Sequence, residues 1–190
     1  MTKRALIIVD LQNDYFAGGK FTLVGIDAAA ANAARLLDAA RAAGDLVVHV
    51  RHEFPSADAP FFVPGSHGAE INKSVLNRDS EPVVLKNSIN AFRGTALKEI
   101  LDHNGIDEVV IAGAMSHICI DAITRAAVDF GYKATVVHDA VATRDLEFNG
   151  IIVPAAQAHA AFMAALGFAY ATLLSTDELL AKSRVLDVTA

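Results

Sequence analysis

The chain has 190 residues, 53% of them hydrophobic, and its 16 Lys and Arg against 22 Asp and Glu give a formal net charge of −6. This length suits one domain, residues 1–190, with a full hydrophobic core, and the composition excludes a disordered chain. No basic cluster points to nucleic acid, and no apolar run is long enough for a secretory signal or a membrane helix. We therefore expect a cytoplasmic globular protein without a nucleic-acid or membrane partner.

Short apolar runs rich in Val and Ile recur along the chain and lack the alternation of strands with one solvent-exposed face. Continuous runs of this kind are typical of strands buried on both faces of a parallel sheet. They predict strands at Ala5–Val9, Leu46–Val50, Val83–Leu85, Val109–Ala112, Ala134–Val137 and Phe168–Leu174.

Alanine-rich segments between these runs predict helices. They lie near residues 28–43, 95–103, 117–130, 155–166 and 176–182. Gly44 suits the end of the first helix, Pro154 the first residue of the fourth, and Thr176 the cap of the last. The alternation of strand and helix predicts an α/β fold, a doubly wound six-stranded parallel sheet with helices on both faces.

Residues 52–81 interrupt this alternation with a stretch rich in Phe, Pro and Gly. A segment of this length without regular structure is uncommon in a compact domain and often serves as an active-site lid. Alternatively, Phe61 and Phe62 anchor the segment or contact a partner subunit. The sequence leaves both interpretations open.

Three chemically useful side chains fall at the carboxyl ends of predicted strands, where doubly wound sheets bind their ligands. Asp10 follows the first strand, Lys86 follows the third, and Cys119 lies in the first turn of the helix after the fourth. Each alone is commonplace, because strand-end charges are usually solvated and a lone cysteine usually packs as a small hydrophobic residue. Their convergence on one edge of the sheet predicts a catalytic site.

These groups suit nucleophilic catalysis. We expect Lys86 and the helix N-terminus to lower the pKa of Cys119 and to favour its thiolate. Asp10 is expected to accept the thiol proton and to return it to a departing amine. The glycine-containing turn before Cys119 offers backbone N–H groups to a developing oxyanion.

The seven histidines allow a competing arrangement. His138 and Asp139 follow the fifth strand and form, with Cys119, a conceivable Cys–His–Asp site, which would leave Asp10 and Lys86 without a role. The chain carries no phosphate-binding glycine motif and no HExxH motif, so we expect no cofactor and no metal ion.

Three segments together resemble the isochorismatase-like cysteine hydrolases, a superfamily that includes nicotinamidases, N-carbamoyl amidohydrolases and streptothricin hydrolase-like enzymes. The segments are Asp10-Leu11-Gln12-Asn13-Asp14-Tyr15, Lys86 with Asn90-Ala91-Phe92, and Gly113-Ala114-Met115-Ser116-His117-Ile118-Cys119-Ile120-Asp121 leading to Thr124-Arg125-Ala126-Ala127.

This resemblance covers essentially the whole chain and implies a triad of Asp10, Lys86 and Cys119. It also implies a cis peptide before Met115 and an oxyanion hole made by the backbone N–H groups of Met115 and Cys119. The family fold is a six-stranded parallel sheet. A homodimer or homotetramer is implied as well, in which a neighbouring subunit often closes the pocket.

Two features depart from named members of the superfamily. Nicotinamidases carry a metal-binding Asp-Trp-His after the second strand, whereas this chain has His52 in place of the Asp and Phe54 in place of the His. Metal-dependent nicotinamidase activity is therefore not expected. True isochorismatases replace the nucleophilic cysteine, so Cys119 argues against vinyl-ether hydrolysis.

The sequence thus predicts a hydrolase that cleaves the C–N bond of a small amide, lactam or ureido compound through a thioester on Cys119. The expected substrate-binding residues are Tyr15, Phe54, Phe61, Phe62, Phe92 and His117. Two alternatives remain. One is a vinyl-ether hydrolase that needs only Asp10 and Lys86, and the other is a catalytically silent binding protein on the same fold.

Overall fold

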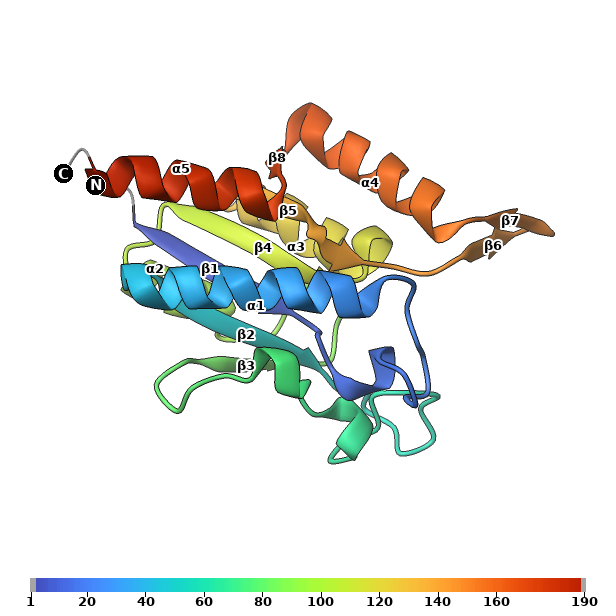
Figure 1. Ribbon diagram of the computed structural model, residues 1–190. Coiled ribbons are helices and arrows are strands. Elements are labelled where there is room, and N and C mark those ends of the chain that lie inside the picture. Colours follow the sequence, from blue (N-terminus) through green and yellow to red (C-terminus); the bar gives the residue numbers. More distant parts are fainter. Residues whose placement is uncertain (1–2, 189–190) are drawn as a thin grey trace.

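A six-stranded, fully parallel sheet forms the centre of the computed structural model, which describes the backbone of residues 3–188 and the side chains of residues 3–182 (Figure 1). The strand order is β3-β2-β1-β4-β5-β8. The strands are β1 (Arg4–Val9), β2 (Leu46–His52), β3 (Val83–Lys86), β4 (Glu108–Ala114), β5 (Lys133–Ala142) and β8 (Ala171–Leu174). All six correspond to predicted strands.

Helices cover both faces of the sheet (Figure 1). Helices α1 (Ile26–Ala43) and α5 (Thr176–Val188) pack on one face, and α2 (Leu97–His103), α3 (Asp121–Asp129) and α4 (Ala155–Ala169) belong to the other. Strand β1 supplies both cores, because successive side chains of a strand point to opposite faces. Leu6 and Ile8 join the α1 side, and Ile7 joins the α2–α3 side. The predicted doubly wound fold is confirmed.

The chain after β5 differs most from the prediction. Strands β6 (Leu146–Phe148) and β7 (Ile151–Val153) form an antiparallel hairpin that extends away from the sheet (Figure 1). Helix α4 runs through Ala169, so β8 begins at Ala171 rather than at Phe168, whose side chain is 92% exposed.

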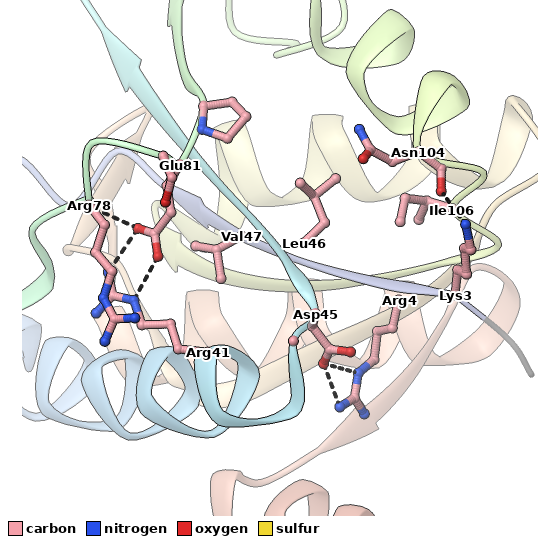
Figure 2. Close-up of a pocket in the computed structure, with 13 residues that line it drawn as sticks. Lys3, Arg4, Arg41, Asp45, Leu46, Val47, Arg78, Glu81, Asn104 and Ile106 are labelled. Atoms are coloured by element: carbon pink, nitrogen blue, oxygen red, sulfur yellow. Dashed lines mark hydrogen bonds and ion pairs between the residues drawn. The ribbon is translucent and has the colours of Figure 1, made fainter.

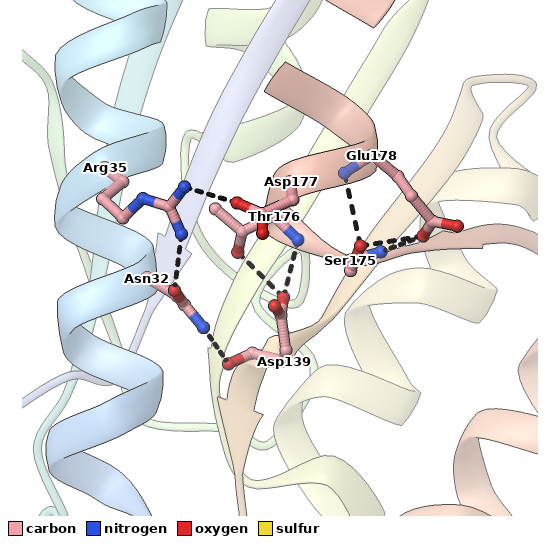
Figure 3. Close-up of polar contacts among 7 residues, drawn as sticks. All are labelled: Asn32, Arg35, Asp139, Ser175, Thr176, Asp177 and Glu178. Carbon is pink, nitrogen blue, oxygen red and sulfur yellow. Dashed lines mark hydrogen bonds and ion pairs between the residues drawn. The ribbon is translucent and has the colours of Figure 1, made fainter. Parts of the chain in front are cut away.

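Helix α5 is longer than the predicted span 176–182, and its cap is Ser175 rather than Thr176. The Ser175 hydroxyl accepts from the Glu178 backbone N–H, and the Glu178 carboxylate accepts from the Ser175 backbone N–H at 2.7 Å (Figure 3). This reciprocal pair is a capping box. Pro154 precedes α4 rather than starting it, whereas Gly44 ends α1 with φ 72° as predicted.

The segment 52–81 is packed against the domain. Phe62 is buried and its backbone N–H donates to Asp14 Oδ2 at 2.7 Å, while Phe61 stacks on Phe21 with centroids 4.1 Å apart. Short 3-10 turns at His67–Ala69 and Lys73–Val75 interrupt it. The two phenylalanines therefore anchor the segment, as one of the two interpretations expected.

The strand order reverses between β1 and β4. From β1 the chain builds outward through β2 and β3, and then crosses to β4, β5 and β8 on the other side. The carboxyl edge of the sheet at this point is where open α/β sheets bind ligands. No helix within the described residues is long and apolar enough to cross a membrane.

Candidate active site

Asp10 occupies the first position after β1, beside the strand-order reversal. Its φ is +53°, a left-handed conformation that side-chain-bearing residues seldom adopt and that clusters at functional sites. The neighbouring strand fits closely here, because a Cβ on Gly113 would lie 2.0 Å from the Val9 carbonyl oxygen. Only glycine allows β4 to approach β1 at this point. The Asp10 carboxylate is consequently held rigidly and fully buried.

Lys86 ends β3, two strands away from Asp10, and its side chain spans the distance. Its Nζ lies 2.9 Å from Asp10 Oδ2, 3.3 Å from Cys119 Sγ and 2.9 Å from His52 Nδ1. Strands in a sheet lie about 4.8 Å apart, so only a long side chain reaches from β3 across β2 to the end of β1. Burial lowers the pKa of Lys86, but Asp10 and Cys119 outweigh burial and raise it above its usual value. The amine is therefore an ammonium ion.

Cys119 is the fourth residue of a π-helical turn, Ser116–Ile120, that joins β4 to α3. The peptide bond between Ala114 and Met115, just before this turn, is cis, as the family resemblance implied. The Cys119 side chain is buried, and burial raises the pKa of its thiol, with Asp10 raising it further and Lys86 opposing. The expectation of a lowered pKa is therefore wrong for the free protein. Desolvation outweighs the nearby cation, and the resting sulfur is a thiol.

His52 is a neighbour of Lys86 that the sequence did not assign to the triad. It pairs with Lys86 in the register of β2 and β3, so both side chains project from the same face. Burial lowers the pKa of His52 to about 4, and the charge of Lys86 lowers it too. The imidazole is therefore neutral near pH 7.

Aromatic rings gather beside the triad. Tyr15 packs on Phe62 with centroids 4.6 Å apart, and His52 packs edge-on against Phe54 at 4.5 Å. Phe61 contacts Tyr15, Phe54 and Phe62. Burial raises the pKa of Tyr15 well above its usual value, and the negative charge of Asp10 adds to this. These four predicted pocket residues share one cluster.

Phe92 stands apart from that cluster. Its ring contacts are Phe130, at 5.1 Å, and Tyr132, at 6.3 Å, in the layer of α2 and α3. Both partners follow the end of α3 and precede β5, toward the amino edge of the sheet. Phe92 therefore lies apart from the other four aromatic residues that the sequence assigns to the pocket.

A pocket of about 470 Å³ opens beside the turn that carries Cys119. Met115, His117 and Ile118 form one wall, and Phe21 and Arg144 lie among the other lining residues. His117 Nδ1 is 2.7 Å from Thr143 Oγ1, and burial, followed by the charge of Arg144, lowers the pKa of His117. His117 therefore presents a neutral ring to the pocket.

Arg144 and Phe21 are the pocket residues that sequence reasoning missed. The Arg144 guanidinium carbon lies 4.2 Å from the centroid of Phe21, and no carboxylate within the described side chains pairs with it. Phe21 also packs on Tyr15, so the aromatic cluster continues from the triad to Arg144. An Arg shortly after β5 carries no sequence signal, because its place depends on how the chain turns toward the hairpin.

The alternative site built on Asp139 does not form. Figure 3 shows Asp139 at the start of α5, where its Oδ1 accepts from the backbone N–H and the hydroxyl of Thr176, both at 2.8 Å. Its backbone carbonyl accepts from the Asn32 side chain of α1 at 2.9 Å. The carboxylate that would have oriented His138 therefore binds the start of α5, and the Asp139 backbone carbonyl binds α1.

Another pocket lies at the opposite edge of the sheet. Figure 2 shows this cavity of about 560 Å³ near the beginnings of β1 and β2. Its charged walls are internally paired, with Arg4 on Asp45 and Arg41 on Glu81, both at 2.7 Å. This pocket lies at the amino ends of the strands, whereas Asp10 and Lys86 follow or end their strands at the carboxyl edge.

The residues around His52 do not suit the metal ion of nicotinamidases. Phe54 offers no donor atom, and the Nδ1 atom of His52 already accepts from an ammonium ion. Among the described side chains, no three from His, Cys, Asp and Glu come together as a metal-binding group. His52 thus binds the Lys86 ammonium, and its Nδ1 atom is not available to a metal ion.

Comparison with known proteins gives this arrangement a family. The model of the isochorismatase domain matches residues 4–178. The chain belongs to the isochorismatase family. It is similar to the isochorismatase family protein YddQ of Bacillus subtilis, with 46% identity over 93% of this chain and 98% of that protein. A solved structure described as an isochorismatase hydrolase from Oleispira antarctica is 58% identical, with a TM-score of 0.92 over 95% of this chain and 97% of its own.

Other members of the isochorismatase family similar to this chain carry names that state an amide-cleaving activity. The maleamate amidohydrolase of Pseudomonas putida is 34% identical over 75% of this chain and 73% of its own length. The family resemblance noted from the sequence is confirmed, and with it the place of the chain among hydrolases of this family.

Proposed function

We propose that the protein is a cysteine hydrolase that cleaves the C–N bond of a small amide, lactam or ureido compound. The observation that carries this proposal is a buried ammonium, Lys86 Nζ, placed 2.9 Å from Asp10 and 3.3 Å from Cys119 Sγ. A base, a nucleophile and a cation in mutual contact are the groups that acyl transfer through sulfur needs.

The reaction begins with proton transfer, because the resting sulfur is a thiol. Asp10 takes the proton from Sγ, and Lys86 stabilises the thiolate that forms. Asp10 Oδ2 pairs with Lys86 Nζ at 2.9 Å, whereas Oδ1 has no hydrogen-bond partner within the described residues, so Oδ1 can receive this proton. The raised pKa of Cys119 means that the base, and not a standing thiolate, supplies the nucleophile.

The thiolate then attacks the substrate carbonyl carbon and forms a tetrahedral oxyanion. As the family resemblance implies, the backbone N–H groups of Met115, which caps the π-helical turn, and of Cys119 within the turn stabilise that oxygen. Collapse of the intermediate breaks the C–N bond, and Asp10 gives its proton to the departing nitrogen. Water, deprotonated by Asp10, then hydrolyses the Cys119 thioester and releases the acid.

The pocket walls favour a compact substrate with an anionic group. Phe21 lines the pocket and continues into the rings of Tyr15 and Phe61, which adds an apolar surface. Asp145 and Glu147 also line the pocket, but neither pairs with Arg144, whose guanidinium has no carboxylate partner among the described residues. A planar guanidinium binds a carboxylate through two parallel hydrogen bonds. Maleamate, the substrate named for one relative, is an amide that carries a carboxylate.

The proposal is tested with a panel of small amides, ureas and lactams, each with and without a carboxylate, on wild type and on Cys119→Ala. We expect turnover of carboxylate-bearing amides by wild type and its loss in Cys119→Ala and after iodoacetamide treatment. Amide turnover that survives both treatments would refute the covalent mechanism. A chain without turnover of any compound would favour a binding protein.

A further inference from the structure

His52 lies closest to the triad of all the groups that the proposed mechanism leaves unused. It is buried, and its Nδ1 atom is 2.9 Å from Lys86 Nζ. An ammonium ion only donates hydrogen bonds, so Nδ1 is the acceptor and carries no proton. The neutral ring therefore holds its proton on Nε2.

An ammonium ion has three N–H donors. In this protein three groups receive them, namely the Asp10 carboxylate at 2.9 Å, His52 Nδ1 at 2.9 Å and Cys119 Sγ at 3.3 Å. Without His52 one N–H of the Lys86 ammonium would be buried without an acceptor. The flexible Lys86 side chain would then rotate toward another acceptor and away from Cys119 Sγ. The third acceptor thus fixes the direction of the other two contacts.

Neighbouring residues hold the backbone of His52 and pack against its ring. Gln12 clamps its backbone from both sides, donating to the His52 carbonyl at 2.8 Å and accepting from the His52 N–H at 2.7 Å. Phe54 lies edge-on to the imidazole with centroids 4.5 Å apart. With its backbone held in register with Lys86, His52 presents its Nδ1 atom to one position of the ammonium.

We infer that His52 is a positioning residue, whose unprotonated Nδ1 atom holds the Lys86 ammonium against Asp10 and Cys119 and so sets the reactivity of the sulfur. The inference rests on the proposed role of Cys119 as nucleophile. In this role His52 acts only through its contact with Lys86 and does not touch the substrate.

The test compares His52→Asn with His52→Leu, two side chains of nearly equal shape. The Asn oxygen takes the place of Nδ1 and accepts from Lys86, whereas Leu cannot accept. The readout is the rate of alkylation of the single cysteine by iodoacetamide as a function of pH, which needs no substrate. A failure of the amidase proposal therefore leaves this measurement intact.

We expect His52→Leu to slow alkylation about tenfold at a fixed pH, with a higher apparent pKa of Cys119, because a buried donor is left unsatisfied. His52→Asn should remain within about threefold of wild type, the size of one net hydrogen bond. Equal rates in wild type and His52→Leu, or equal losses in both variants, would overturn the inference.

His49→Leu is the matched control, since His49 is a buried histidine on the same strand whose Nε2 contacts Glu81 at 3.2 Å. It should lower the melting temperature but leave alkylation within about twofold, as expected for a separate site.

Nitrogen NMR of the wild-type protein tests the inference without any variant that must fold. At pH 7 we expect the chemical shift of an unprotonated nitrogen for His52 Nδ1 and that of a protonated nitrogen for Nε2. A proton on Nδ1, or a doubly protonated ring, would overturn it.

Discussion

Asp10 and Lys86 form a buried ion pair, and we expect the loss of Lys86 to lower the free energy of unfolding more than the loss of the Asp10 charge. Lys86→Met removes the one cation that contacts Asp10 among the described side chains, and it leaves a carboxylate that is 0% exposed without its partner at 2.9 Å. Removing one partner of a buried pair typically costs about 3–5 kcal/mol. We expect Lys86→Met to lie in that range.

The opposite change should cost less. In Asp10→Asn the ammonium keeps two acceptors, His52 Nδ1 and Cys119 Sγ, and the new amide oxygen offers a third. We expect a loss of about 1–3 kcal/mol, the cost of imperfect pairing of one buried group. In the double variant the uncompensated carboxylate is absent, so its loss should be smaller than the sum of the two single losses.

Urea unfolding of wild type, both single variants and the double variant measures these free energies. The order expected is wild type, then Asp10→Asn, then Lys86→Met, with a favourable coupling energy in the cycle. Equal destabilisation by both single variants, or purely additive losses, would refute the asymmetric placement of partners described above.

Further predictions concern the glycine, the pocket, the thiol and self-association. Gly113→Ala should destabilise the protein by more than about 4 kcal/mol in urea unfolding, because its φ is +131° and its Cβ would meet the Val9 carbonyl; a small loss would contradict this contact. Arg144→Met should raise KM for carboxylate-bearing amides by about tenfold or more, with less effect on neutral amides; equal effects on both would remove Arg144 from substrate binding. Alkylation of Cys119 in wild type should still rise with pH above about 9, since burial raises the pKa of the thiol; a plateau near neutral pH would show a standing thiolate. Light scattering should find a homodimer or homotetramer, because α4 carries no Asp, Glu, Lys or Arg and leaves Phe168 exposed; a monomer would contradict the expectation.

The catalytic edge was readable from the sequence because parallel strands place their carboxyl ends together. Asp10, Lys86 and Cys119 each follow a short Val- and Ile-rich run, so assigning the runs was enough to bring the residues to one edge. Distance along the chain did not matter, since the order of the strands sets the meeting point.

The pKa of the thiol was not readable in the same way. A helix start and a nearby lysine favour the thiolate, but the sequence does not reveal that Cys119 is buried. Desolvation then dominates and reverses the direction of the shift. His52 was hidden for a related reason, because its contact with Lys86 depends on the register between β2 and β3.

The hairpin of β6 and β7 was not predicted, although the sequence of its turn is typical of hairpins. Asn149 and Gly150 both have positive φ, 51° and 78°, and this dipeptide favours a two-residue hairpin turn. The flanking strands are only three residues long and largely exposed, so they lack the buried runs that revealed the other six. By contrast, the start of β8 was misplaced because Phe168 continues the apolar pattern of α4 into the strand.

The most direct test of the account is the mass of the Cys119 peptide after rapid mixing of enzyme with its best amide and acid quench. The account predicts a transient adduct equal to the acyl part of the substrate, present in wild type and absent in Cys119→Ala. Product release without any adduct on this peptide, at every quench time, would contradict it.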